Sequence, residues 1–196
     1  MKAVNRTLLL FAFLLMFFQV NAQIGTYFEE TAAPQFYLGL GTGINSYTAL
    51  LGISGNYRVA EKLFIEGGLG IGMWGYKTSI GLRYHRNLLK GLTYGFSFAS
   101  CSGLKAFTTE MEVQSGAIEE VTMDLSRANT LNLKTGYFWT LGTSNTFYID
   151  AGYSFALNNQ PYKVQDGSAL SSTSIAVMEI LSPGGILLGL GFTFGL

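Results

Sequence analysis

Apolar and polar residues alternate along most of the chain after residue 34. Alternation with period two indicates a β-strand with one apolar face, whereas a helix would repeat every 3.6 residues. No window shows a sustained helical period, and the three prolines lie outside the alternating segments or at their edges. We therefore predict an all-β chain. Its eight strands are residues 35–45, 49–59, 63–75, 78–88, 92–104, 128–141, 146–158 and 185–196.

Each segment has one face of large apolar residues and one face of small or polar residues. In residues 185–196, large apolar side chains fill the even positions from 186 to 194, and glycine or threonine fills the odd positions from 189 to 195. A soluble barrel would need a surface rich in lysine and glutamate. The second face here carries mostly Gly, Ser, Thr and Asn, which suits a filled interior better than a surface in water. The apolar face is then expected to contact lipid, and each segment is long enough to span a membrane.

The connections between these segments differ in length between the two ends of the predicted barrel. The second, fourth and sixth connections (60–62, 87–91 and 142–145) are short, and the two long ones (105–127 and 159–184) are the fifth and seventh. The long connections therefore lie at the same end of an up-and-down barrel. Outer-membrane barrels have this pattern, with short periplasmic turns, longer extracellular loops and aromatic girdles. Aromatic residues on the apolar face near the short-turn ends form a candidate girdle: Phe36, Tyr57, Tyr84, Tyr94, Trp139, Phe147 and Phe194.

The first 22 residues have the pattern of a secretory signal peptide. Lys2 and Arg6 precede an unbroken apolar run over residues 8–18, and Val20 and Ala22 provide the small-residue cleavage pattern. The run is shorter than the roughly 20 residues of a membrane-spanning helix. We predict cleavage after Ala22, a periplasmic segment over 23–34 and a barrel over 35–196.

These features together resemble small outer-membrane β-barrel proteins: the OmpA transmembrane domain, OmpX-like barrels and the PorT-like barrels of Bacteroidetes. The resemblance rests on the signal peptide, the eight strands, the short turns and the final stretch GLGFTFGL. It departs from many such barrels at Leu196, where they end in an aromatic residue. It implies an eight-stranded antiparallel up-and-down transmembrane β-barrel in the outer membrane of a Gram-negative bacterium. Such a protein is expected to be a monomer in contact with outer-membrane lipid.

Charge and cysteine content exclude several classes of function. Residues 23–196 contain 10 basic and 12 acidic residues, so the basic patch of a nucleic-acid-binding protein is not expected. Cys101 is the single cysteine, which excludes an internal disulfide and a cysteine metal cluster. We expect no cofactor.

Strict alternation places six charged or titratable side chains in the interior: Arg58, Glu66, Arg83, His85, Lys134 and Asp150. If Gly75 and Tyr76 form the turn between the third and fourth segments, Glu66 lies opposite His85, with Arg83 one diagonal step away. Asn56 would face Glu66 from the second segment, with Arg58 on the diagonal. Charges inside a narrow barrel need partners, so we predict a lumenal ion-pair network. A proton-sensitive or ion-conducting path through His85 is the alternative.

Glycines surround Glu66 in the third segment, at positions 67, 68, 70 and 72. Glycine weakens a strand unless another group needs its space. Gly68, Gly70 and Gly72 share the lumenal face with Glu66, and we expect them to make room for larger lumenal side chains such as Tyr37, Phe138 or Arg83.

The long connection 105–127 is acidic, and it contains Glu110, Glu112, Glu119, Glu120 and Asp124. It is interpreted either as a solvated loop or as a surface that binds a cation or a protein partner. Its alternation also allows a hairpin that extends beyond the membrane, with a turn near Ser115 and Gly116.

Function follows from these assignments. An outer-membrane lipid-modifying enzyme would place its base at the extracellular rim, and the single histidine, His85, falls near the opposite end. We expect a non-enzymatic barrel whose loops 105–127 and 159–184 contact an extracellular or envelope partner. A narrow porin-like channel or a PorT-type secretion-associated barrel is the alternative, and a lipid-modifying enzyme is a more distant one.

Overall fold

The computed structural model describes residues 34–158, 162–165 and 169–196. The predicted signal peptide (1–22) and nearly all of the predicted segment 23–34 lie outside the described residues. Eight strands form a closed antiparallel barrel in the order β1-β11-β9-β8-β5-β4-β3-β2, which confirms the predicted fold class. The strands are β1 (Phe36–Ile44), β2 (Leu51–Ala60), β3 (Leu63–Gly72), β4 (Gly75–His85), β5 (Lys90–Cys101), β8 (Ala128–Leu141), β9 (Asn145–Ala156) and β11 (Gly185–Gly195).

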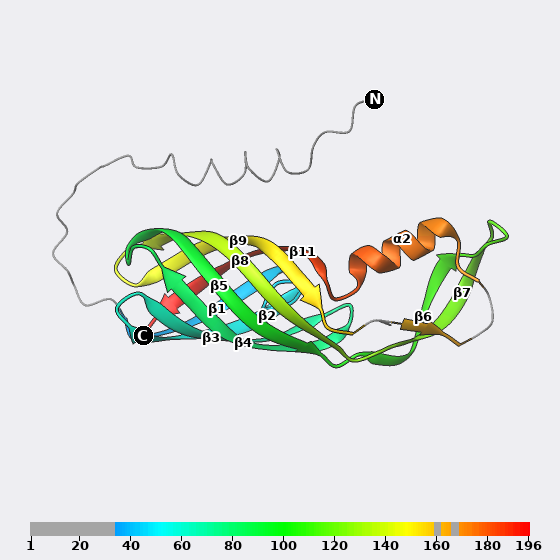
Figure 1. Ribbon diagram of the computed structural model, residues 1–196, viewed down its shortest axis with the longest axis horizontal. Helices are drawn as coiled ribbons and strands as arrows, with labels where there is room; N and C mark the ends of the chain where they lie inside the picture. The colour runs from blue at the N-terminus through cyan, green and yellow to red at the C-terminus, as the bar shows by residue number, and fades with distance from the viewer. Residues whose placement is uncertain (1–33, 159–161, 166–168) are drawn as a thin grey trace, which may run out of the picture. The chain divides into compact units, whose positions relative to one another are not determined.

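The connections give the barrel two different ends. At the end that we call the short-turn end, a few residues each join β2 to β3, β4 to β5 and β8 to β9. At the opposite end, the chain turns tightly between β3 and β4 and leaves the barrel after β5 and β9 (Figure 1). The C-terminus lies at the short-turn end (Figure 1).

One predicted turn is wrong. The turn between β3 and β4 contains Met73 and Trp74, because Gly72 pairs with Gly75. Glu66 therefore pairs with Gly81 and not with His85. Gly75 adopts a φ of 80°, which glycine tolerates at the end of a tight turn. The pairing differs from the predicted one by four residues. Because four is an even number, every side chain keeps its predicted face.

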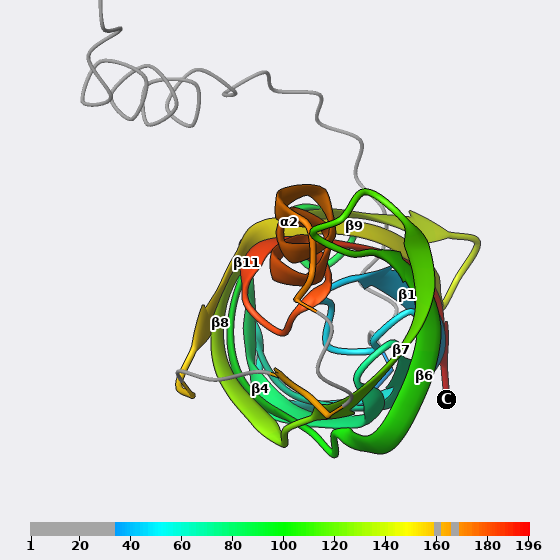
Figure 2. The same cartoon turned by 90° about the vertical axis from the view of Figure 1, so that its right-hand side faces the viewer.

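The described parts of the two long connections fold into one module, which we call the cap. A hairpin of β6 (Leu104–Glu112) and β7 (Ile118–Leu125) turns at Ser115 and Gly116, as predicted. The short strand β10 (Tyr162–Val164) pairs with β7, and a helix, α2 (Ser172–Leu181), follows it along the chain. Figure 1 shows these elements beyond the end of the barrel that lies opposite the short-turn end, and Figure 2 shows them from that side, in front of the barrel. Among the described residues, no helix is both long and apolar enough to cross a membrane.

The cap has a hydrophobic core of its own. Val121, Met123 and Leu125 of β7 pack with Met178 of α2 and with Trp74 of the β3–β4 turn. The indole Nε1 of Trp74 also donates a hydrogen bond to Ser126 O, at 3.1 Å. The long connections are therefore a packed structure that is attached to the barrel.

Helix α2 was not predicted from the sequence. Ser171 caps its first turn, because its Oγ accepts a hydrogen bond from Ser174 N at 3.2 Å. Ser174 is buried and donates to Glu112 O at 2.8 Å, while Ile175 and Ile180 are exposed. The inner face therefore combines Ser174 with the buried Met178, and apolar residues also lie on the outer face, so the helix gives no amphipathic signal of the usual kind.

Candidate functional site

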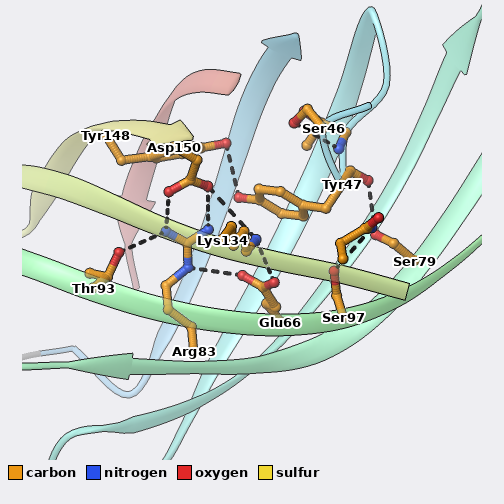
Figure 3. Close-up of polar contacts among 12 residues, drawn as sticks. Ser46, Tyr47, Glu66, Ser79, Arg83, Thr93, Ser97, Lys134, Tyr148 and Asp150 are labelled. Atoms are coloured by element: carbon orange, nitrogen blue, oxygen red, sulfur yellow. Dashed lines mark hydrogen bonds and ion pairs between the residues drawn. The ribbon is translucent and has the colours of Figure 1, made fainter. Parts of the chain in front are cut away.

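Four charged side chains meet inside the barrel, each from a different strand (Figure 3). Arg83 of β4 donates from Nε to Glu66 Oε2 on β3 at 2.9 Å. Its Nη1 and Nη2 donate to the two oxygens of Asp150 on β9, at 2.9 and 2.7 Å. Lys134 of β8 places Nζ 2.5 Å from Glu66 Oε1 and 3.7 Å from Asp150 Oδ2. We call these four residues the lumenal network.

Each member of the lumenal network has glycine as a direct cross-strand partner. Gly81 lies opposite Glu66, Gly95 lies opposite both Arg83 and Lys134, and Gly136 lies opposite Asp150. A Cβ at Gly95 would lie 2.6 Å from Lys134 Cε. These glycines therefore supply the space that long charged side chains need inside a narrow barrel.

The charges of the lumenal network balance. Two cations face two carboxylates, and all four residues are buried, Glu66 to 1% exposure. The fork of Arg83 binds Asp150 through two parallel bonds, which is the strongest geometry for this pair. A buried network of this kind is costly to break, because removal of one partner leaves another charge uncompensated.

A turn of the backbone also lies inside the barrel. Residues 46–48, between β1 and β2, fold inward, and we call them the inner turn. Tyr47 is 2% exposed, and its hydroxyl donates to the hydroxyl of Tyr148 at 2.9 Å. Ser79 Oγ donates to Tyr47 O at 2.8 Å. Lys134 Nζ lies 3.9 Å from the centre of the Tyr47 ring, close enough for a cation–π contact (Figure 3). The inner turn thus covers the lumenal network.

The glycines of β3 make room for this inner turn. A Cβ at Gly68 would lie 3.0 Å from Tyr47 C, and one at Gly70 would lie 2.7 Å from Thr48 C. The expectation that these glycines accommodate Tyr37, Phe138 or Arg83 is therefore corrected. Backbone, which cannot move aside as a flexible side chain can, takes the space beside Gly68 and Gly70.

Two of the six predicted interior residues lie apart from the lumenal network. The His85 ring lies between the rings of Phe64 and Phe138, with centres 4.4 and 4.6 Å away. His85 lines a small recess of about 40 Å³ that includes Tyr37. Arg58 lies opposite Phe64 and is half-buried, and within the described residues it forms no ion pair.

Three interior residues near the lumenal network, Lys77, Tyr148 and Tyr47, were not among those predicted from the sequence. Lys77 falls between the predicted strands 63–75 and 78–88, but β4 begins at Gly75, so Lys77 is a strand residue that is buried in the interior. Tyr148 shares the face of Asp150, two residues away, and alternation could have identified it. Tyr47 carried no such signal, because it lies in a connection.

The five acidic residues of 105–127 lie on β6 and β7, where they have different surroundings. Glu112 Oε2 accepts from Ser171 Oγ at 3.1 Å, and Asp124 Oδ1 accepts from Ala106 N at 2.9 Å. These two carboxylates therefore fasten parts of the cap to one another. Glu110 and Glu120 are exposed and directly opposite each other across the hairpin, and Glu119 is exposed. In the described part of the chain, no group of three or more His, Cys, Asp or Glu side chains could hold a metal ion.

A scan against models of protein families finds no match to this chain, and a search of curated proteins finds none either. Of the resemblance predicted from the sequence, the structure therefore shows the coarser part, a closed eight-stranded antiparallel β-barrel.

Proposed function

We propose that this chain is an outer-membrane β-barrel protein whose interior is plugged and whose cap contacts a partner outside the cell. The observation that carries the proposal is the reversal of polarity between the two faces of the barrel. The interior holds the lumenal network, while every barrel strand exposes large apolar side chains outward. One exposed example from each strand is Leu40, Ile53, Leu69, Ile80, Phe96, Leu133, Ile149 and Leu190.

Such an outer face is suited to lipid. In water, each exposed apolar side chain forgoes about 25 cal/mol for every Å² that could be buried. Aromatic residues also pair across strands near the short-turn end: Phe36 with Tyr57, Tyr84 with Tyr94, and Trp139 with Phe147. Aromatic girdles occupy this level in outer-membrane barrels. By the same analogy, the short-turn end faces the periplasm and the cap faces outward.

The filled interior favours a role outside the barrel over transport through it. The inner turn lies across the lumen, and Lys134 and Arg83 bind both carboxylates beneath it. A rigid barrel that carries a folded cap can present that cap to a partner. We propose a non-enzymatic role for the same reason, since the interior charges are committed to one another.

Tryptophan quenching tests the membrane assignment. Trp74 and Trp139 are the two tryptophans of the chain. Trp139 lies on the outer face and is 37% exposed, whereas Trp74 is in the cap core and is 4% exposed. In vesicles whose acyl chains are brominated near the headgroup, W74F, which keeps Trp139, should be strongly quenched. W139F, which keeps Trp74, should be quenched much less. Equal quenching of the two variants would contradict the proposal that the outer face of the barrel contacts lipid.

The orientation has a separate test in intact cells. In a C101A background, a cysteine introduced at Glu120 of the cap should react with a membrane-impermeant maleimide. A cysteine at Thr143, an exposed residue of the β8–β9 turn, is the matched control and should react only after the outer membrane is opened. The reverse pattern would overturn the orientation.

Conductance separates the plugged barrel from the channel alternative. The purified protein should show no steady single-channel current in a planar bilayer. A steady current in the wild type would favour the porin-like alternative instead.

A further inference from the structure

A buried lysine at the cap end of the barrel has no carboxylate partner among the described residues. Lys77 of β4 is 5% exposed. Its Nζ donates to Asn45 O at 3.0 Å, and no ion pair with it is found in the described part of the chain. An ammonium group has three N–H donors. A buried cation without a counter-ion is costly, so an anion that reached Lys77 would gain from this arrangement.

Lys77 lines a crevice of about 90 Å³ between the β1–β2 connection, the β3–β4 turn and the end of α2. The other walls are mainly apolar, and they include Ile44, Leu50, Met73, Trp74, Ile180 and Pro183. Ile44, Leu50, Met73 and Ile180 are exposed, so the crevice reaches the surface beside the apolar outer face.

The side chains of Asn45 and Cys101 also line the crevice, and Cys101 is a free thiol. The side-chain amide of Asn45 donates to Gly184 O at 2.6 Å and to Ile186 O at 3.1 Å, and it accepts from Gly184 N at 3.2 Å. Of the described residues that line the crevice, Lys77 is the only charged one. The crevice therefore combines one cationic group with apolar walls and an apolar exit.

We propose that this crevice binds the carboxylate end of a free fatty acid. The carboxylate accepts hydrogen bonds from Lys77 Nζ, and the first carbons of the chain pack against Trp74 and the apolar walls. The rest of the chain leaves past Leu50 and Met73 along the outer face. One positive charge and a crevice of this size suit a monoanionic carboxylate better than a bulky phosphate headgroup. The exit path rests on the proposed membrane assignment.

Trp74 provides a direct readout, because it lines the crevice. In the W139F/C101A background, Trp74 is the single tryptophan, and the free thiol of Cys101, which lines the crevice and could be alkylated by an α-bromo acid, is absent. The folded protein in a non-ionic detergent is titrated with 2-bromohexadecanoate, whose bromine lies next to the carboxylate. We expect saturable quenching of Trp74. The methyl ester, which has no charge, should bind about 10–100-fold more weakly, as expected for loss of a charge-assisted hydrogen bond.

Two variants and a control make the test specific. K77M removes the charge at similar length and should weaken binding by a similar factor, whereas K105M, at an exposed cap residue, should not change it. G72V fills the crevice without changing the charge, because a Cβ at Gly72 meets only Ala49 Cβ at 3.5 Å and Leu50 N at 3.9 Å within 4 Å. It should also weaken binding, and it remains informative if K77M fails to fold.

Equal quenching by the acid and its methyl ester, or undiminished quenching in a folded K77M or G72V variant, would overturn the site. So would the absence of saturable quenching in the W139F/C101A protein. Such a failure is distinguishable from failure of the membrane assignment, because the brominated-vesicle experiment contains no free fatty acid.

Discussion

Replacement of Arg83 by methionine should destabilise the barrel by about 3–5 kcal/mol, the usual cost of breaking a buried ion pair by removing one partner. The structure shows why the cost is high. Arg83 donates three hydrogen bonds of 2.7–2.9 Å to Glu66 and Asp150. Without it, two buried carboxylates share the single cation Lys134, which lies 2.5 Å from Glu66 but 3.7 Å from Asp150. Asp150 is therefore left with the weaker contact.

Urea unfolding of the protein in lipid vesicles measures this loss. For a urea dependence of about 1–3 kcal/mol per M, the midpoint should fall by at least about 1 M. R86M is the matched control: Arg86 is exposed, so its replacement should change stability by no more than about 0.5 kcal/mol. The double variant R83M/D150N restores charge balance and should recover part of the loss. The reasoning is refuted if R83M unfolds at the wild-type midpoint, or if the double variant is less stable than R83M.

Two further predictions concern the cap and the glycines. E110K replaces a like-charged cross-strand pair with an attractive one opposite Glu120, and should stabilise the hairpin by about 0.2–1 kcal/mol. Slower amide hydrogen exchange in β6 and β7 at low salt would show this, and no change in exchange would contradict it. G152A should destabilise the barrel by about 1–3 kcal/mol, because its Cβ would lie 2.7 Å from a backbone Cα of β8. G67A is the control, since its Cβ meets nothing closer than 3.8 Å, and equal urea midpoints for the two variants would refute the argument.

The eight barrel strands could be predicted from the sequence because alternation is a local signal that the folded structure preserves. Large apolar side chains on the outer side and small or polar side chains on the lumenal side make the two faces chemically different in every strand. The prediction of which face each side chain occupies was therefore correct even where the predicted strand pairing was wrong. Glu66 and Arg83 meet although the predicted β3–β4 turn was displaced, since the error was an even number of residues.

The remaining features depend on contacts between distant segments. The inner turn is held by Ser79 and Tyr148, which lie far from Tyr47 along the chain, so the alternation around Tyr47 gives no indication of it. Helix α2 could not be predicted from the sequence for a different reason. Its buried face combines Met178 with Ser174, whose partner is the backbone of β6, while Ile175, Val177 and Ile180 are exposed. A pattern that assumes an apolar inner face and a polar outer face cannot detect such a helix.

Asn45 links the inner turn to the closure of the barrel. Its side chain holds Gly184 and Ile186, at the start of the last strand along the chain, while the inner turn begins at the next residue. The first hairpin can therefore reach its final anchorage only when β11 arrives beside β1. We therefore expect the final docking of the inner turn in the lumen and the pairing of β11 with β1 to be coupled during assembly. An intermediate with seven strands in place would have an open wall and an incompletely anchored inner turn.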